Sequence, residues 1–240
     1  MIDILLLGVL IGLWHAMDID HIAAMITFIA VDNSSRLHSI VYGLIWGLGH
    51  AAMLMIVALA VMTLNLQIGD EFAWLMEFLV AVMLVILALD LFRRLAKVEV
   101  HTHEHQHSTE AVHNHVHVHM ENTAHAPKRH AHRHYKGYFG RALLVGLMHG
   151  SAGSAALILL VLQTISSKAL GIVYVIMFGI GSTLGMTLLT AIISVQLHRS
   201  HLRSAELARA LRSFAAIVTL SVGLFLMFKA GVSAELFMMI

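Results

Sequence analysis

Long apolar stretches separated by short polar segments dominate the chain. Six of these stretches approach or exceed the length of about 20 residues that a helix needs to cross a bilayer. They cover residues 4–30, 40–64, 72–92, 140–164, 170–196 and 211–230. We therefore predict an all-α polytopic membrane protein with six transmembrane helices.

The composition agrees with this pattern. Hydrophobic residues make up 59% of the 240 residues, charged residues 12%, and the mean hydropathy is +0.83. Soluble domains carry about 25% charged residues, so a soluble globule is excluded. The chain has no cysteine, which excludes disulfides and thiolate metal sites. We expect a lipid bilayer as the surroundings, no nucleic-acid partner, and no cleavable signal, because the first stretch is too long and lacks a basic leading region.

Basic residues concentrate on one side of the predicted bundle. With six spans, 13 of the 15 lysines and arginines fall in or beside the segments 31–39, 93–139 and 197–210. They are Arg36, Arg93, Arg94, Lys97, Lys128, Arg129, Arg133, Lys136, Arg141, Arg199, Arg203, Arg209 and Arg212. Only Lys168 and Lys229 fall on the other side. The positive-inside rule then makes the 13-residue side cytoplasmic and puts both termini outside, in the cytoplasmic membrane of a prokaryote.

A short internal repeat divides the apolar stretches into two halves. Residues 12–16 (GLWHA) resemble 146–150 (GLMHG), and residues 46–50 (WGLGH) resemble 178–182 (FGIGS), at offsets of 134 and 132. Two halves of three spans each have opposite topology, and such inverted repeats put a substrate site near the midplane. We predict three-helix repeats at 1–96 and 140–240, joined by a loop at 97–139.

Glycine pairs four residues apart fall in the first, second, fourth and fifth spans. They are Gly8/Gly12, Gly43/Gly47, Gly146/Gly150 and Gly181/Gly185. Small residues at this spacing allow helix backbones to approach closely in lipid. We expect these four helices to pack against one another.

The segment between the third and fourth spans differs from the rest of the chain. Residues 101–134 contain 12 of the 19 histidines and little apolar sequence, which predicts a disordered cytoplasmic loop. Histidine-rich tracts are typical of metal binding, although imidazole suits nickel, cobalt, copper and zinc alike. A solvated spacer is the alternative. We predict an auxiliary metal-buffering role for His101, His103, His105, His107, His113, His115, His117 and His119.

Charged and imidazole side chains interrupt the first apolar stretch. His15, Asp18, Asp20 and His21 lie there, and a charge at membrane depth costs about 2.5–3.5 kcal/mol on insertion scales. Such residues usually face a cavity or pathway, and together they suit divalent first-row metals. The alternative is an Asp–His pair that only stabilises packing.

The spacing of these residues limits how they can meet one ion. On an ideal helix His15, Asp18 and His21 follow one side, whereas Asp20 falls on another. Either the helix is interrupted here, with Gly12 the nearest residue that eases a break, or Asp20 orients a ligand histidine through its other ring nitrogen. Both possibilities stay open.

Further ligand candidates lie in other spans. His50 follows Gly49 in the second span, and His149 occupies the repeat position of His15. Ser151 and Ser182 are secondary candidates, because hydroxyl oxygens can also contact a metal ion. For any lone histidine the alternative is a hydrogen-bonded place in the core.

The run His15-Ala16-Met17-Asp18-Ile19-Asp20-His21-Ile22 resembles the signature of the nickel/cobalt transporter family, His-Ala-x-Asp-Ala-Asp-His-Ile. Seven of the eight positions fit, with Ile19 as the departure. Residues 48–50 (LGH) resemble an element of that family's second conserved helix, and the likeness extends to compact urease-associated nickel permeases. The resemblance implies a permease and not an enzyme, with Ni²⁺ or Co²⁺ as transported substrate and no cofactor. A cytoplasmic metallochaperone is a further expected partner.

We expect uptake into the cytoplasm, with efflux as the alternative direction of transport. The His-x4-Asp-His run resembles the uptake branch, whereas a histidine-rich cytoplasmic loop resembles that of exporters. A membrane metalloenzyme and a non-transporting metal-sensing or delivery protein are the alternatives from other classes. The first needs histidine boxes on ordered helices, which the sequence lacks; the second predicts metal bound only at 101–134.

Overall fold

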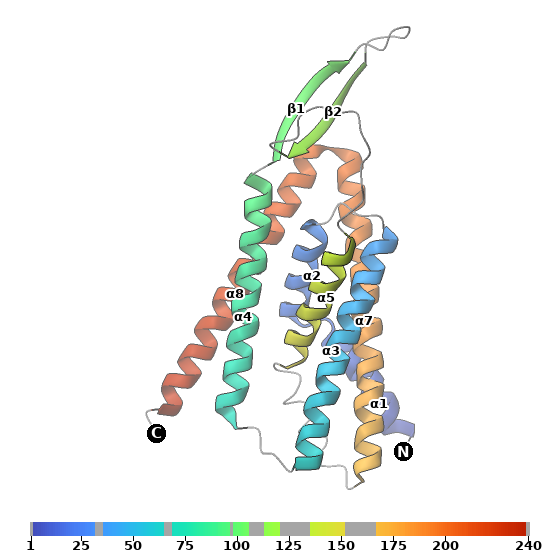
Figure 1. Cartoon of the computed structure of the whole chain (residues 1–240), viewed down its shortest axis with the longest axis vertical. Helices are drawn as coiled ribbons and strands as arrows, with labels where there is room; N and C mark the ends of the chain where they lie inside the picture. Colours follow the sequence, from blue (N-terminus) through green and yellow to red (C-terminus); the bar gives the residue numbers. More distant parts are fainter. Residues whose placement is uncertain are drawn as a thin grey trace.

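The computed structural model describes residues 2–31, 36–64, 69–96, 98–105, 113–120, 135–151 and 167–238. It is a bundle of helices with a two-stranded hairpin at one end (Figure 1). The helices are α1 (Ile2–His15), α2 (Ile19–Val31), α3 (Arg36–Leu64), α4 (Asp70–Ala96), α5 (Tyr135–Gly150), α7 (Lys168–Arg203) and α8 (Ala205–Met238). The strands are β1 (Val98–His105) and β2 (His113–Met120).

The predicted class, an all-helical membrane protein, is confirmed for the transmembrane part. The helices α3, α4, α7 and α8 are each long and apolar enough to cross a membrane. Helices α1 and α2 pass the same test only together, as a bent pair that is either a broken span or a re-entrant loop. The expected span at 140–164 is described only as far as Ser151, where α5 ends, and its remainder lies outside the described residues. The prediction of six spans therefore stays a prediction.

The first span is interrupted, as the sequence suggested. Helices α1 and α2 are inclined by 56° to each other. The main-chain N–H groups of Met17 and Asp18 donate to Trp14 O (2.9 Å) and His15 O (3.0 Å), which closes the end of α1 with tight turns. The carbonyl of Asp18 then accepts from Ile22 N at 3.0 Å and begins α2. The break thus falls at residues 16–18, and the expectation that Gly12 eases it is wrong.

Part of the histidine-rich segment is ordered. Strands β1 and β2 pair antiparallel, with His101 opposite His117 and His103 opposite His115. The expectation of a wholly disordered loop at 101–134 is therefore wrong for the part of it that lies in these strands. The alternation of histidine with valine, threonine or glutamate has the two-residue period of a strand, and the β-branched residues favour extended backbone. His107 lies outside the described residues.

Glycine allows four helix backbones to touch. A Cβ on Gly12 would overlap the main-chain oxygen of Phe178 in α7, and a Cβ on Gly146 in α5 would overlap that of Trp46 in α3. A Cβ on Gly49 would lie 2.7 Å from Leu143 O. The expected close packing of α1, α3, α5 and α7 is confirmed.

The remaining helices α2, α4 and α8 pack mainly through buried apolar side chains, such as Ala30, Leu91 and Ala216. The hydroxyls of Thr27 (α2) and Thr219 (α8) lie 2.6 Å apart, and Thr219 donates to Ala23 O at 2.8 Å. Near the end of α4, Arg94 Nε donates to Asp90 Oδ2 at 3.0 Å, which is a helix-end ion pair. The apolar packing and the Thr27–Thr219 pair hold α8 and α4 beside α2, whereas the Asp90–Arg94 pair lies within α4 itself.

Candidate metal centre

Four imidazoles gather where the break between α1 and α2 meets α3 and α5. His15 ends α1, His21 lies in the first turn of α2, His50 lies in α3 and His149 in α5. Their exposed fractions are 4%, 2%, 0% and 2%. Helices from both halves of the chain thus contribute to one buried cluster, which we call the histidine cluster.

The rings are in direct contact. Ring centroids lie 4.7 Å apart for His15 and His21, 5.2 Å for His15 and His50, 5.2 Å for His21 and His50, and 4.8 Å for His21 and His149. One ring nitrogen from each of His15, His21 and His50 lies within 4.8 Å of the others. Nitrogens that share one ion at about 2.0–2.1 Å lie roughly 3–3.5 Å apart. Small movements of these rings would therefore let all three bind one ion.

Most of the ring nitrogens lack a hydrogen bond. Within the described residues, both nitrogens of His15 and of His50 and the Nε2 atoms of His21 and His149 are buried without a hydrogen-bond partner. Buried polar atoms are normally hydrogen-bonded, so a cluster of unpaired nitrogens calls for an explanation. A metal ion can accept the lone pair of the unprotonated nitrogen of each neutral imidazole ring.

Asp20 holds one of these rings in place. Its Oδ1 accepts from the main-chain N–H of His21 at 3.0 Å and lies 3.1 Å from His21 Nδ1, while its Oδ2 lies 4.0 Å from His149 Nε2. A carboxylate on Nδ1 fixes the ring and leaves Nε2 free to bind, as in many metal sites. Of the two possibilities that the sequence left open, the structure has both: the helix is broken and Asp20 contacts a histidine.

Asp18 lies nearer the rim of the cluster. Its Oδ2 is 2.7 Å from His15 Nδ1, although the direction of approach does not fit a hydrogen bond, and its side chain is 45% exposed against 23% for Asp20. This half-open position suits a group that first meets an arriving cation.

The two serine candidates have partners in their own helices. Ser151 Oγ donates to Met148 O at 2.7 Å, and Ser182 Oγ donates to Gly179 O at 3.1 Å. Their hydrogens are thus used locally, and only oxygen lone pairs remain to face an ion. Both stay secondary candidates.

Two aromatic residues that were not among the candidates from the sequence flank the histidine cluster. The ring of Phe178 lies 5.5 Å from that of His15, and the ring of Trp46 lies 5.3 Å from that of His149. Trp46 is 2% exposed, and its Nε1 has no hydrogen-bond partner within the described part of the chain. The sequence signal that could have pointed to these two residues is the internal repeat, which relates Trp46 to Phe178 at an offset of 132.

Comparison with known proteins adds one match. No family model matches the chain, and no solved structure matches it. A curated protein of Bacillus sp. (strain TB-90), "Urease accessory protein UreH", is 31% identical over 239 residues, which covers 99% of this chain and 96% of that protein. The chain belongs to the UreH family of urease accessory proteins. The relation to urease-associated proteins expected from residues 15–22 is thereby confirmed. UreH is described as accessory to urease, in line with the expectation that this chain is not an enzyme.

Neutralising Asp20 tests its contact with His21. In Asp20→Asn we expect Ni²⁺ affinity to fall by about 10–100-fold, the usual effect of losing a carboxylate behind a metal-binding histidine. Titration of the purified protein with Ni²⁺ in detergent measures it. Asp90→Asn is the matched control, since Asp90 pairs with Arg94 and not with a histidine. Equal affinity in the two variants would show that Asp20 does not support the cluster.

Proposed function

We propose that this protein carries Ni²⁺ or Co²⁺ across the cytoplasmic membrane into the cytoplasm, through an intramembrane site formed by the histidine cluster with Asp18 and Asp20. The main support for this proposal is the set of buried imidazole nitrogens that lack hydrogen bonds, at the break between α1 and α2. Keeping several unpaired polar atoms at membrane depth is unfavourable unless they serve a ligand.

The donor set supports a transition metal as cargo. Neutral imidazole with carboxylate suits nickel, cobalt, copper and zinc, and suits magnesium or calcium poorly. Within this group, the motif at residues 15–22 favours nickel and cobalt, and the family's link to urease supports the same choice. The ion would shed part of its water, bind the rings, and leave on the other side.

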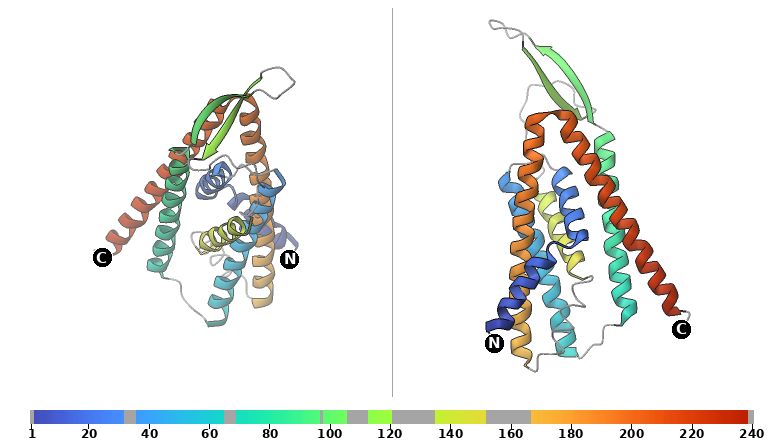
Figure 2. Two further views of the ribbon diagram at one scale, coloured as in Figure 1. Left: turned by 45° about the horizontal axis from the view of Figure 1, so that its top comes forward. Right: turned by 180° about the vertical axis from the view of Figure 1, so that it is seen from behind.

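The packing of the helices supports two inverted repeats. Helix α1 begins at one end of the bundle and stops about half-way, whereas α5 begins at the opposite end and also stops about half-way (Figure 2). The contact of Gly12 with Phe178 is repeated, at the offsets of 134 and 132, by that of Gly146 with Trp46. Two such halves rocking about a fixed site are the usual route to alternating access.

The position of the hairpin supports the expected orientation. The start of α1 and the end of α8 lie at the end of the bundle opposite β1 and β2 (Figure 1). Arg93 and Arg94 end α4, next to β1, whereas Lys168 begins α7 at the far end. With the basic end in the cytoplasm, both termini are outside and the hairpin can catch metal on arrival. A cytoplasmic metallochaperone as recipient stays a prediction.

Flux in proteoliposomes of known orientation tests the proposal. We expect ⁶³Ni²⁺ to enter vesicles whose interior corresponds to the cytoplasm, and excess Co²⁺ to compete more strongly than Mg²⁺ or Ca²⁺. Flux in the opposite direction only would replace uptake with efflux. Absence of flux in both orientations, with Ni²⁺ still bound by the purified protein, would favour sensing or delivery.

A further inference from the structure

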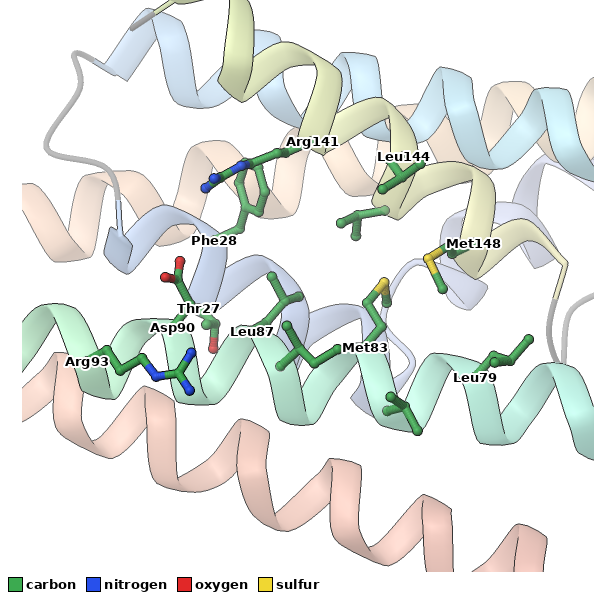
Figure 3. A pocket seen from close by; sticks show the side chains of 13 residues that line it. Thr27, Phe28, Leu79, Met83, Leu87, Asp90, Arg93, Arg141, Leu144 and Met148 are labelled. Carbon is green, nitrogen blue, oxygen red and sulfur yellow. The ribbon is translucent and has the colours of Figure 1, made fainter.

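A second feature of the bundle lies away from the histidine cluster. A cavity of about 470 Å³ separates α4 from α2 and α5 (Figure 3). Its walls are mostly apolar and include Val82, Met83, Leu87 and Leu144. Ile86 and Leu144, which also line it, are 60% and 59% exposed, so the cavity opens on the outer surface that would face lipid.

One end of the cavity is charged. Arg93 and Asp90 of α4 and Arg141 of α5 gather there, while Leu79 and Met148 lie at the other end (Figure 3). Asp90 already accepts from Arg94 Nε at 3.0 Å, so this carboxylate is paired with an arginine outside the cavity lining, while Arg93 and Arg141 both line the cavity. The charged end therefore has an excess of positive charge. It lies in the last turn of α4, where the candidate span ends at Ala96, so it lies near the level of lipid head groups.

The combination of an apolar cavity and a basic end matches one kind of molecule. A protein interior is close-packed and rarely keeps an empty apolar space of this size, whereas an acyl chain from the bilayer can enter and fill it. Arginine binds phosphate through two parallel hydrogen bonds, and its five N–H groups leave donors to spare beside an existing partner. Basic pockets between transmembrane helices on the cytoplasmic side are suited to anionic head groups.

We propose that this cavity binds one anionic phospholipid, with an acyl chain between α4 and α5 and the phosphate between Arg93 and Arg141. The lipid completes the packing of α5, which contacts α4 little by itself and carries His149. The proposal does not depend on metal transport, because none of the cavity-lining residues belongs to the histidine cluster.

Native mass spectrometry of the full chain in detergent tests the proposal. The probes are dioleoyl phosphatidylglycerol, dioleoyl phosphatidylcholine and inorganic phosphate. We expect one phosphatidylglycerol to be retained at least ten times more strongly than phosphatidylcholine, and phosphate without acyl chains not to be retained. Equal retention of the two lipids, or retention of phosphate alone, would overturn the proposal.

Two sets of variants locate the site. Arg93→Gln/Arg141→Gln should lower phosphatidylglycerol retention at least tenfold, while the matched control Arg199→Gln/Arg209→Gln, which removes the same charge from α7 and α8, should not. Asp90→Asn should strengthen retention by removing the carboxylate that lines the charged end. If the charged end instead served a passing cation, Asp90→Asn would reduce ⁶³Ni²⁺ flux and leave lipid retention unchanged, which would refute the proposal. Melting temperatures of all variants show whether they fold.

Discussion

Replacing both His15 and His21 with alanine is expected to reduce Ni²⁺ uptake to the background of empty vesicles. The substitutions remove two of the four rings of the histidine cluster, leaving Asp18 without its imidazole contact and Asp20 with only His149 at 4.0 Å. Losing even a supporting partner of a metal-binding histidine costs about 10–100-fold in affinity, so losing two rings should exceed about 100-fold. Initial rates of ⁶³Ni²⁺ uptake at several concentrations measure the loss.

Two control proteins make this result specific. His198→Ala/His201→Ala removes two imidazoles from the last turns of α7, away from the helix break, and should leave uptake unchanged. Deleting residues 101–134 removes 12 histidines and should lower uptake only when Ni²⁺ is scarce, as expected for a buffer. Full uptake after loss of His15 and His21 would exclude the histidine cluster as the transport site. Metal binding that disappears only with the deletion would place the binding site within residues 101–134 instead.

The sequence predicted much of the histidine cluster because polar residues in an apolar stretch have few alternatives. His15 and His21 had to face one another or another helix. Asp20 lies on a different side of an ideal helix from His15 and His21, which indicated either a break in the helix or a supporting role for Asp20. The location of the break could not be predicted from Gly12, because that glycine lies against α7 instead. Helix contact and helix interruption both favour glycine, and sequence alone does not separate them.

Two other features needed the structure. The hairpin was missed because the polar composition of residues 101–134 outweighed an alternation that fits strands. The contact of Trp46 with His149 could not be predicted, because it depends on how α3 meets α5 and leaves no mark on the sequence pattern of either helix. The periodicity within one segment does not reveal which spans that are distant in sequence contact each other.

Substituting Gly146 with valine is expected to destabilise the protein severely. Even a Cβ at this position would overlap the main-chain oxygen of Trp46, and a backbone atom cannot move aside as a side chain can. Overpacking a tight contact costs about 1–3 kcal/mol, and the branched side chain places this case at or above the upper end. Because Gly146 lies about one helical turn before His149, separating α5 from α3 should also weaken Ni²⁺ binding.

Thermal unfolding in detergent, with and without Ni²⁺, measures both effects. Gly140→Val is the matched control, since no atom within the described residues lies within 4 Å of a Cβ at that position of the same helix. Gly12→Val changes the repeat-related contact with Phe178 and should lower the melting temperature by a similar amount. Equal melting temperatures for Gly146→Val and Gly140→Val would show that α5 and α3 are not held in backbone contact. A large loss at Gly146 with none at Gly12 would argue against two equivalent halves, because the symmetry requires both contacts to be tight.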